Sequence, residues 1–205
     1  MEFLKSNTKV RLYSYGGSGL KFLAKFLKKY MDATARRNNS HRRPCKEFKD
    51  SDKIIVIYGD PRNAILSFFR KRNKKGKQWL NKHLQHLGIN QKLPSNINLE
   101  TFLQDSNDMF DLNGFLNDWL NFNFNKKDFV LFIKYESLFD GIEKLFDFLD
   151  LDKSIKDDFI KDFQTQFKLR QSNYKNKGSK IQALFYDKYK TVIDLYLSLD
   201  DIFVR

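Results

Sequence analysis

Two stretches in the N-terminal third set the fold: Leu12-Tyr-Ser-Tyr-Gly-Gly-Ser-Gly-Leu-Lys-Phe-Leu23 and Ile54-Ile-Val-Ile-Tyr-Gly-Asp-Pro-Arg-Asn-Ala-Ile-Leu-Ser-Phe-Phe-Arg70. Each runs from an apolar segment through a short turn into a segment with helical spacing. In the first, glycines at 16, 17 and 19 let backbone N–H groups approach an anion at the start of the helix. The pattern predicts a phosphate cradle, with a plain chain-reversing turn as the alternative.

The glycine turn does not match the standard phosphate-binding motifs. A Walker A loop requires Lys directly after the last glycine, whereas Leu20 here precedes Lys21. The spacing of a dinucleotide-binding G-x-G-x-x-G fingerprint is also absent. A nucleotide kinase therefore stays a less favoured alternative.

The second stretch begins with five apolar or aromatic residues, 54–58, which indicate a buried strand. Asp60 followed by Pro61 is typical of a helix N-cap with proline at the first helical position. Ser67 lies about two turns into this helix. The segment ends in three basic residues, 70–72.

The spacing of these elements resembles the sulfotransferases that use 3′-phosphoadenosine 5′-phosphosulfate (PAPS) as donor. Their second turn carries an R-D-P-R-x-x-x-x-S-x-x-R-like segment, and this chain reads G-D-P-R-N-A-I-L-S-F-F-R. Further matches follow in family order: Trp119, the strand and Tyr-Glu pair within 130–138, and the helix ending in Phe148-Leu-Asp-Leu151. The resemblance covers roughly residues 8 to 152, with a weak echo at Lys177 and Gly178.

The resemblance implies a donor site and a product, adenosine 3′,5′-bisphosphate, without a metal ion. The 5′-phosphosulfate is expected on the first turn, the 3′-phosphate on the second turn and the late Lys-Gly pair, and the adenine beside a strand-end tyrosine. The residues implied are Tyr15, Gly16, Gly17, Ser18, Gly19, Leu20, Lys21, Arg62, Ser67, Tyr135, Lys177 and Gly178.

A sulfotransferase needs a base that accepts the proton of the acceptor hydroxyl, and histidine suits this role near neutral pH. His41 stands before a proline-containing stretch, as the catalytic histidine does in cytosolic members of the family. Glu47 is the alternative base, because some carbohydrate sulfotransferases use a carboxylate. His83 and His86 fall in a polar segment without matching context.

The chain departs from the family pattern at two cationic positions, now Gly17 and Gly59. Electrostatic stabilisation of the transferring group is usually the largest catalytic contribution, so the charge is either relocated or lost. Lys21 is a candidate replacement at the first position and therefore a candidate catalytic residue, with Arg62 or Arg70 at the second. If the charge is lost, a non-catalytic protein that binds a nucleotide or an anionic glycan is the alternative.

The composition indicates which class of partner the protein attracts. The 205 residues carry a formal charge of +13, which attracts polyanions such as the donor, an anionic acceptor glycan or nucleic acid. The densest basic stretches flank both turns, which favours charge that belongs to a site over compositional drift. We expect a small-molecule or glycan acceptor, with nucleic acid as the less favoured partner. The single Cys45 excludes an internal disulfide, and neither a signal peptide nor a membrane-spanning run is seen, so a cytoplasmic protein is expected.

Strands alternating with helices predict one three-layer α/β/α domain over residues 1–205, with a central, mostly parallel sheet of the P-loop nucleotide-binding type. We expect strands at 9–14, 54–58 and 129–133. Residues 73–112 are expected to form an insertion or lid, with 73–95 outside the core, and 153–205 a helical C-terminal part. The expected helices are 20–35, one from Pro61, 99–103, 113–122, 142–151, 155–167 and 181–197.

Overall fold

The computed structural model describes residues 6–34, 41–44, 52–76, 78–94, 96–104, 108–124, 129–168 and 174–205. Its centre is a five-stranded sheet in the order β2-β1-β3-β4-β5. The first four strands in this order are parallel, and β5 is antiparallel to β4. The strands are β1 Ser6–Tyr13, β2 Met31–Thr34, β3 Asp52–Tyr58, β4 Val130–Lys134 and β5 Ile202–Val204.

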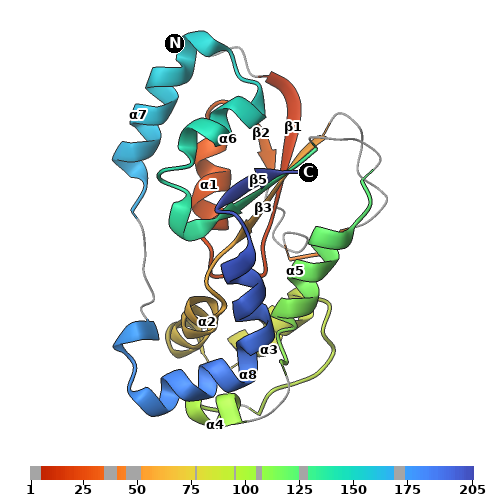
Figure 1. Cartoon of the computed structure of the whole chain (residues 1–205), viewed down its shortest axis with the longest axis vertical. Helices are drawn as coiled ribbons and strands as arrows, with labels where there is room; N and C mark the ends of the chain where they lie inside the picture. The colour runs from red at the N-terminus through yellow and green to blue at the C-terminus, as the bar shows by residue number, and fades with distance from the viewer. Residues whose placement is uncertain are drawn as a thin grey trace.

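Helices cover both faces of the sheet, which confirms the predicted three-layer α/β/α fold. Figure 1 shows α1, α6 and α7 on one side, whereas α2, α3, α4 and α8 gather toward the bottom of the view. The α-helices are α1 Leu20–Leu27, α2 Pro61–Lys75, α3 Trp79–His86, α4 Leu99–Gln104, α5 Leu112–Asn121, α6 Ile142–Leu149, α7 Lys156–Gln166 and α8 Ser179–Ser198; short 3-10 turns are η1 Tyr135–Ser137, η2 Lys153–Ile155 and η3 Tyr174–Asn176.

Strand β3 explains why its sequence is an uninterrupted apolar run. Residues 54, 56 and 58 pack on the face that carries α2 to α5 and α8. Residues 55 and 57 pack on the opposite face with α1, α6 and α7. A strand that is buried on both faces needs no polar alternation, so the run itself predicted a central position.

The chain reverses its direction across the sheet between β1 and β3. From β1 it passes through α1 to β2 at one edge, and from β3 it passes through α2 to α5 to reach β4 on the other side. Ligands of open parallel sheets bind at the carboxyl ends of two strands whose connections diverge in this way. The turns after β1 and β3 both lie at this point.

Two strands were not predicted, and one predicted helix is too long. The helix expected over 20–35 ends at Leu27, and Met31–Thr34 pairs with β1 as β2. Met, Ala and Lys favour helices locally, but pairing with a sheet edge overrides that preference. The three-residue β5 has no sequence signal of comparable strength and is fixed by its pairing with β4.

Helix α3, within the segment 73–95, belongs to the core, contrary to the expectation that this segment lies outside it. Leu80 and Leu84 of α3 are buried at 1% and 0% exposure in the same cluster as β3. Phe102 of α4 and Phe110 are also fully buried there. Helix α3 has one apolar face, although the segment around it is rich in basic and polar residues. Counting polar residues therefore underestimated its burial.

Candidate active site

The turn after β1 is distinguished by its backbone N–H groups. We call residues 16–19 the glycine turn; its three glycines have φ angles of 104°, 78° and 68°. The Gly16 N–H donates to Ser14 Oγ at 3.0 Å. Within the described part of the chain, no acceptor is assigned to the N–H groups of residues 17–21, which include the start of α1. Such an arrangement suits an anion.

The glycine turn is packed so closely that side chains are excluded from it. A Cβ on Gly16 would lie 2.8 Å from the His83 ring, and a Cβ on Gly19 would collide with the Tyr135 ring. A Cβ on Gly17 would meet Ala64 Cα of α2 at 3.0 Å. Backbone atoms of a helix cannot move aside as a side-chain end can, so position 17 accepts only glycine without strain.

Two buried hydroxyls tie the glycine turn to β3. The Tyr15 hydroxyl accepts from the Gly59 N–H at 2.9 Å and donates to the Gly59 carbonyl. Ser18 Oγ donates to the Ile57 carbonyl at 3.3 Å. The Tyr15 side chain is fully buried, and burial raises the pKa of its hydroxyl. Its ring therefore braces the turn, and a ligand contact at this residue is left to its backbone.

His41 lies beside the start of the glycine turn. Its Nδ1 is 2.5 Å from the Ser14 carbonyl oxygen. Because a carbonyl only accepts, Nδ1 carries the proton and Nε2 is the basic nitrogen. Burial, together with the positive side chains nearby, lowers the His41 pKa to about 4, so the ring is neutral at pH 7.

The loop that carries His41 is anchored to α5. Arg43 pairs with Asp118 at 2.6 Å and also with Asp111. The Trp119 indole N–H donates to the Arg42 carbonyl at 3.2 Å. These contacts span 68 to 77 residues of chain, so tertiary structure places the imidazole.

All three histidines of the chain meet here, although the sequence singled out only His41. The His83 ring centre lies 4.9 Å from that of His41, and the His86 ring centre lies 6.3 Å from it. His83 is buried, with Nε2 3.2 Å from the Tyr15 carbonyl and its ring stacked on Trp79 at 5.0 Å. Burial, then the neighbouring positive groups, lower its pKa.

The helical spacing of apolar residues could have indicated that His83 is buried, whereas a count of polar residues did not. Trp79 and His83 are four residues apart, as are Leu80 and Leu84, so they share a helix face. Although the imidazoles adjoin, no three His, Cys, Asp or Glu side chains of the described residues are arranged to hold a metal ion.

Two lysines border His41 from different helices. Lys21 in the first turn of α1 is exposed, and Lys71 on α2 is partly buried with its ammonium 5.5 Å from the Trp79 ring centre. Both lower the pKa of His41. Burial, and then Lys21, Lys75 and Arg70, lower the pKa of Lys71 to about 8.

The turn after β3 is filled by the chain's own carboxylates. Asp60 caps α2 by accepting from the Arg62 N–H at 2.9 Å, and it pairs with the Arg62 guanidinium at 2.7 Å. The Asp60 N–H donates to Glu136 Oε1 at 3.0 Å. Burial raises the pKa of Glu136. The Arg62 guanidinium also lies 3.8 Å from the Tyr174 ring centre. Its charge is therefore paired with Asp60, and its planar face stacks on Tyr174.

The remaining predicted donor residues are only partly brought together. Ser67 is buried, and its Oγ accepts from Arg70 at 3.4 Å. Lys177 and Gly178 are exposed at the start of α8. Their neighbour Tyr174 donates its N–H to Asn63 of α2 at 3.1 Å, which places this segment beside the second turn. Glu47 and Cys45 lie outside the described residues.

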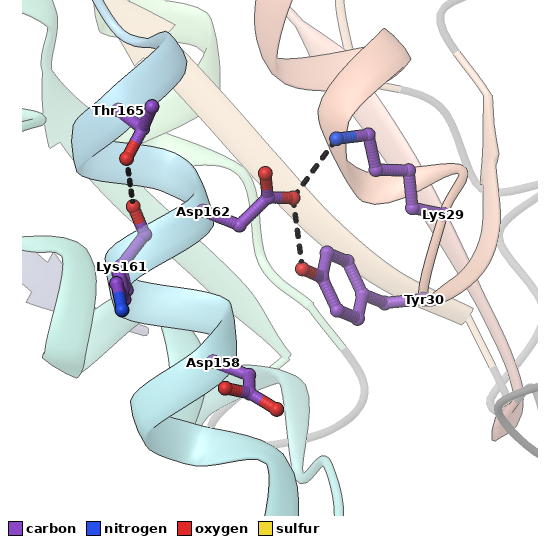
Figure 2. Close-up of a pocket in the computed structure, with 6 residues that line it drawn as sticks. All are labelled: Lys29, Tyr30, Asp158, Lys161, Asp162 and Thr165. Carbon is purple, nitrogen blue, oxygen red and sulfur yellow. Dashed lines mark hydrogen bonds and ion pairs between the residues drawn. The ribbon is translucent and has the colours of Figure 1, made fainter. Parts of the chain in front are cut away.

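A pocket of about 480 Å³ lies between the end of α1 and α7 (Figure 2). In it Asp162 accepts from Lys29 at 2.9 Å and from the Tyr30 hydroxyl at 3.0 Å. Because α1 starts at the glycine turn and runs to the opposite edge of the sheet, this pocket is remote from His41. It is lined by Lys29, Tyr30, Asp158, Lys161, Asp162 and Thr165.

Fold and site together define an α/β protein with an N–H-lined turn and a neutral imidazole at the carboxyl edge of a mostly parallel sheet. A family model described as the sulfotransferase domain matches residues 7–191. The chain therefore belongs to the sulfotransferase family, and sulfotransfer is the class of reaction that the family assignment supports. A search of curated proteins gives no significant match. Among the described helices, none has the length and apolarity to cross a lipid bilayer.

Proposed function

We propose that this protein transfers a sulfuryl group from PAPS to a hydroxyl or amine acceptor. The observation that carries the proposal is His41, held by Nδ1 to Ser14 beside the glycine turn, with Nε2 as its basic nitrogen. Family membership supports sulfotransfer as the reaction class.

The donor's 5′-phosphosulfate would be held by the N–H groups of residues 17–21. Ser67 with Arg70 is the better candidate for the 3′-phosphate, because Arg62 is already paired with Asp60. Lys177 and Gly178, beside the second turn, would close over the same phosphate. Tyr135, packed on Gly19, would flank the adenine.

In the reaction, the acceptor oxygen or nitrogen attacks sulfur, the bond from sulfur to the bridging phosphate oxygen breaks, and adenosine 3′,5′-bisphosphate leaves. The acceptor's proton passes to His41 Nε2. The positive neighbours that lower the His41 pKa oppose this protonation in the free protein. A bound polyanion offsets their charge, so the imidazole becomes a better base when the donor is present.

Calorimetric titration with adenosine 3′,5′-bisphosphate tests the donor site, with AMP and Mg-ATP as controls at fixed ionic strength. Binding in the micromolar range that requires the 3′-phosphate is the expected result. Preference for Mg-ATP, or no binding, would contradict the proposal and favour a kinase or another binding function.

A second candidate is a non-catalytic sulfotransferase-fold protein that binds a nucleotide or an anionic glycan. Gly17 and Gly59 favour it, because both positions lack the cation that the family pattern carries. It predicts bisphosphate binding without transfer from PAPS to any member of a broad acceptor panel. Transfer to one acceptor would exclude it.

A further inference from the structure

Lys21, His41, Lys71, His83 and His86 form a group that we call the basic cluster. It is assembled from α1, the loop after β2, α2 and α3. Lys71 has no place in the site predicted from sequence. It reaches the cluster along Trp79, on whose ring the His83 ring also stacks.

Among the described residues, no carboxylate pairs with the lysines of the basic cluster. The charged groups that shift the pKa values of His41, His83 and Lys71 are all basic. Across the described residues, neither Lys21 nor Lys71 makes an ion pair, whereas Lys29 and Lys156 do. Gathering like charges at a partly buried site costs free energy, and an anion placed between them removes that cost.

The position of the cluster defines which anion fits. The His83 ring lies 2.8 Å from where a Cβ on Gly16 would be, and its Nε2 lies 3.2 Å from the Tyr15 carbonyl oxygen. The cluster therefore adjoins the N–H groups of the glycine turn. Gly17 itself cannot carry a cation, because Ala64 of α2 blocks it. Lys71 lies on the same helix as Ala64, seven residues further along the chain. It therefore supplies positive charge near the turn from a residue that is not part of the turn.

We infer that Lys71 and Lys21 bind a sulfate-like oxyanion between the glycine turn and His41. The inference rests on the proposed function only for the source of the anion. One source is the sulfuryl group of the donor, and the other is an anionic substituent of the acceptor. In either case Lys71 is a binding residue, and it supplies the charge that position 17 lacks.

The first experiment uses inorganic sulfate and needs no nucleotide. The protein is briefly acylated with acetic anhydride, and modified lysines are identified by mass spectrometry, with chloride at equal ionic strength as control. Sulfate is expected to protect Lys71 and Lys21 but not Lys74, an exposed lysine of α2. If sulfate leaves the extent of modification of Lys71 unchanged, as it is expected to do for Lys74, the inference is overturned.

The second experiment identifies the source by comparing wild type, Lys71→Gln and the matched control Lys74→Gln. If the anion is the sulfuryl group, Lys71→Gln lowers the affinity for PAPS about tenfold more than the affinity for adenosine 3′,5′-bisphosphate. If it belongs to the acceptor, both nucleotides bind normally and KM rises about tenfold for anionic acceptors but not for neutral analogues. Lys71→Arg, which keeps the charge, is expected to restore most of either loss.

The outcomes separate the inference from the proposed function. Sulfate protection without bisphosphate binding would retain the anion site and reject PAPS as donor. Bisphosphate binding with Lys71→Gln indistinguishable from Lys74→Gln in every assay would retain the donor and overturn the role of Lys71. Circular dichroism of both variants excludes a loss of folding as the cause.

Discussion

The turns after β1 and β3 share a backbone plan but differ in their electrostatics. Each follows a buried parallel strand and starts a helix at the carboxyl edge of the sheet. At the first turn, N–H groups have no assigned acceptor within the described residues, and the neighbouring groups are basic. At the second, Asp60 and Glu136 already accept the N–H groups that an anion would need.

The difference shows that a strand, a glycine and a helix in succession do not by themselves make a phosphate site. Glu136 reaches the second turn from a position 76 residues away in the chain. Its carboxylate fills the place at a helix N-terminus that a phosphate would take. The presence of a counter-charge also distinguishes the pocket of Figure 2 from the basic cluster. In that pocket, Asp162 neutralises Lys29.

The largest expected effect comes from His41, which we propose as the base beside the first turn. His41→Ala is expected to lower transfer from PAPS by about a hundredfold or more, the usual contribution of a general base. Its affinity for adenosine 3′,5′-bisphosphate should stay close to that of wild type. The measurement is the rate of radiolabelled sulfate transfer to an acceptor that wild type uses, and full activity of the variant would reject His41 as the base.

The close approach of α2 to the first turn makes Gly17 more sensitive than a glycine in open space. Gly17→Ala is expected to cost about 1–2 kcal/mol for its positive φ and about 1–3 kcal/mol more for the contact with Ala64. Gly88 has a similar φ of 81° and nothing within 4 Å, so Gly88→Ala isolates the first cost.

Urea unfolding of the two variants gives the difference directly. Gly17→Ala should also weaken bisphosphate binding, whereas Gly88→Ala should not. Equal stability losses would mean that α2 yields at Ala64, and the first turn would then be less rigid than its contacts indicate.

At the second turn, removal of the carboxylate should affect stability more than binding. Asp60→Ala is expected to lower the free energy of unfolding by about 1 kcal/mol, because the N-cap bond to the Arg62 N–H is lost. Asp60→Asn keeps a capping oxygen and should cost less. It also releases the Arg62 guanidinium, so bisphosphate affinity should stay equal or rise. Weaker binding in Asp60→Asn would erase the contrast between the two turns.

The smallest expected effect is the pH dependence of the rate near neutrality. With a His41 pKa of about 4, the base is already neutral throughout the range from about pH 6 to pH 8, so kcat/KM should be nearly flat there on account of this group. It should fall only as the pH approaches about 4. A rate that halves near pH 6.5 would show an imidazole with its ordinary pKa and an open site.

The same shift affects stability with a defined sign. Between an unfolded pKa of about 6.5 and the folded value of about 4, the unfolded chain binds more protons at this group. Stability contributed by the neutral ring is therefore present above about pH 6.5 and lost as pH falls toward 4. Thermal unfolding of wild type and His41→Ala over this range should converge as the pH falls.

Local patterns were sufficient for the three central strands, for the helix starting at Pro61 and for most later helices. They failed where a long-range contact overrides local preference. Residues 31–34 became β2 by pairing with β1, and α3 became core by burying Leu80 and Leu84. His83 was passed over for the same reason, since its role depends on contact with Gly16 and Tyr15 rather than on its sequence neighbours.

The sequence by itself determined the two strand–turn–helix junctions and the α/β fold, because glycine, proline and apolar runs restrict the backbone locally. Its resemblance to the family singled out His41 as the candidate base. Only the tertiary structure decided that the first turn is open to an anion while the second is closed by Glu136. It also decided that Lys21 and Lys71 lie close enough to His41 to lower its pKa, and that His83 and His86 lie beside it. Electrostatic fields depend on distances in space, and those distances are set by packing between segments far apart in the chain.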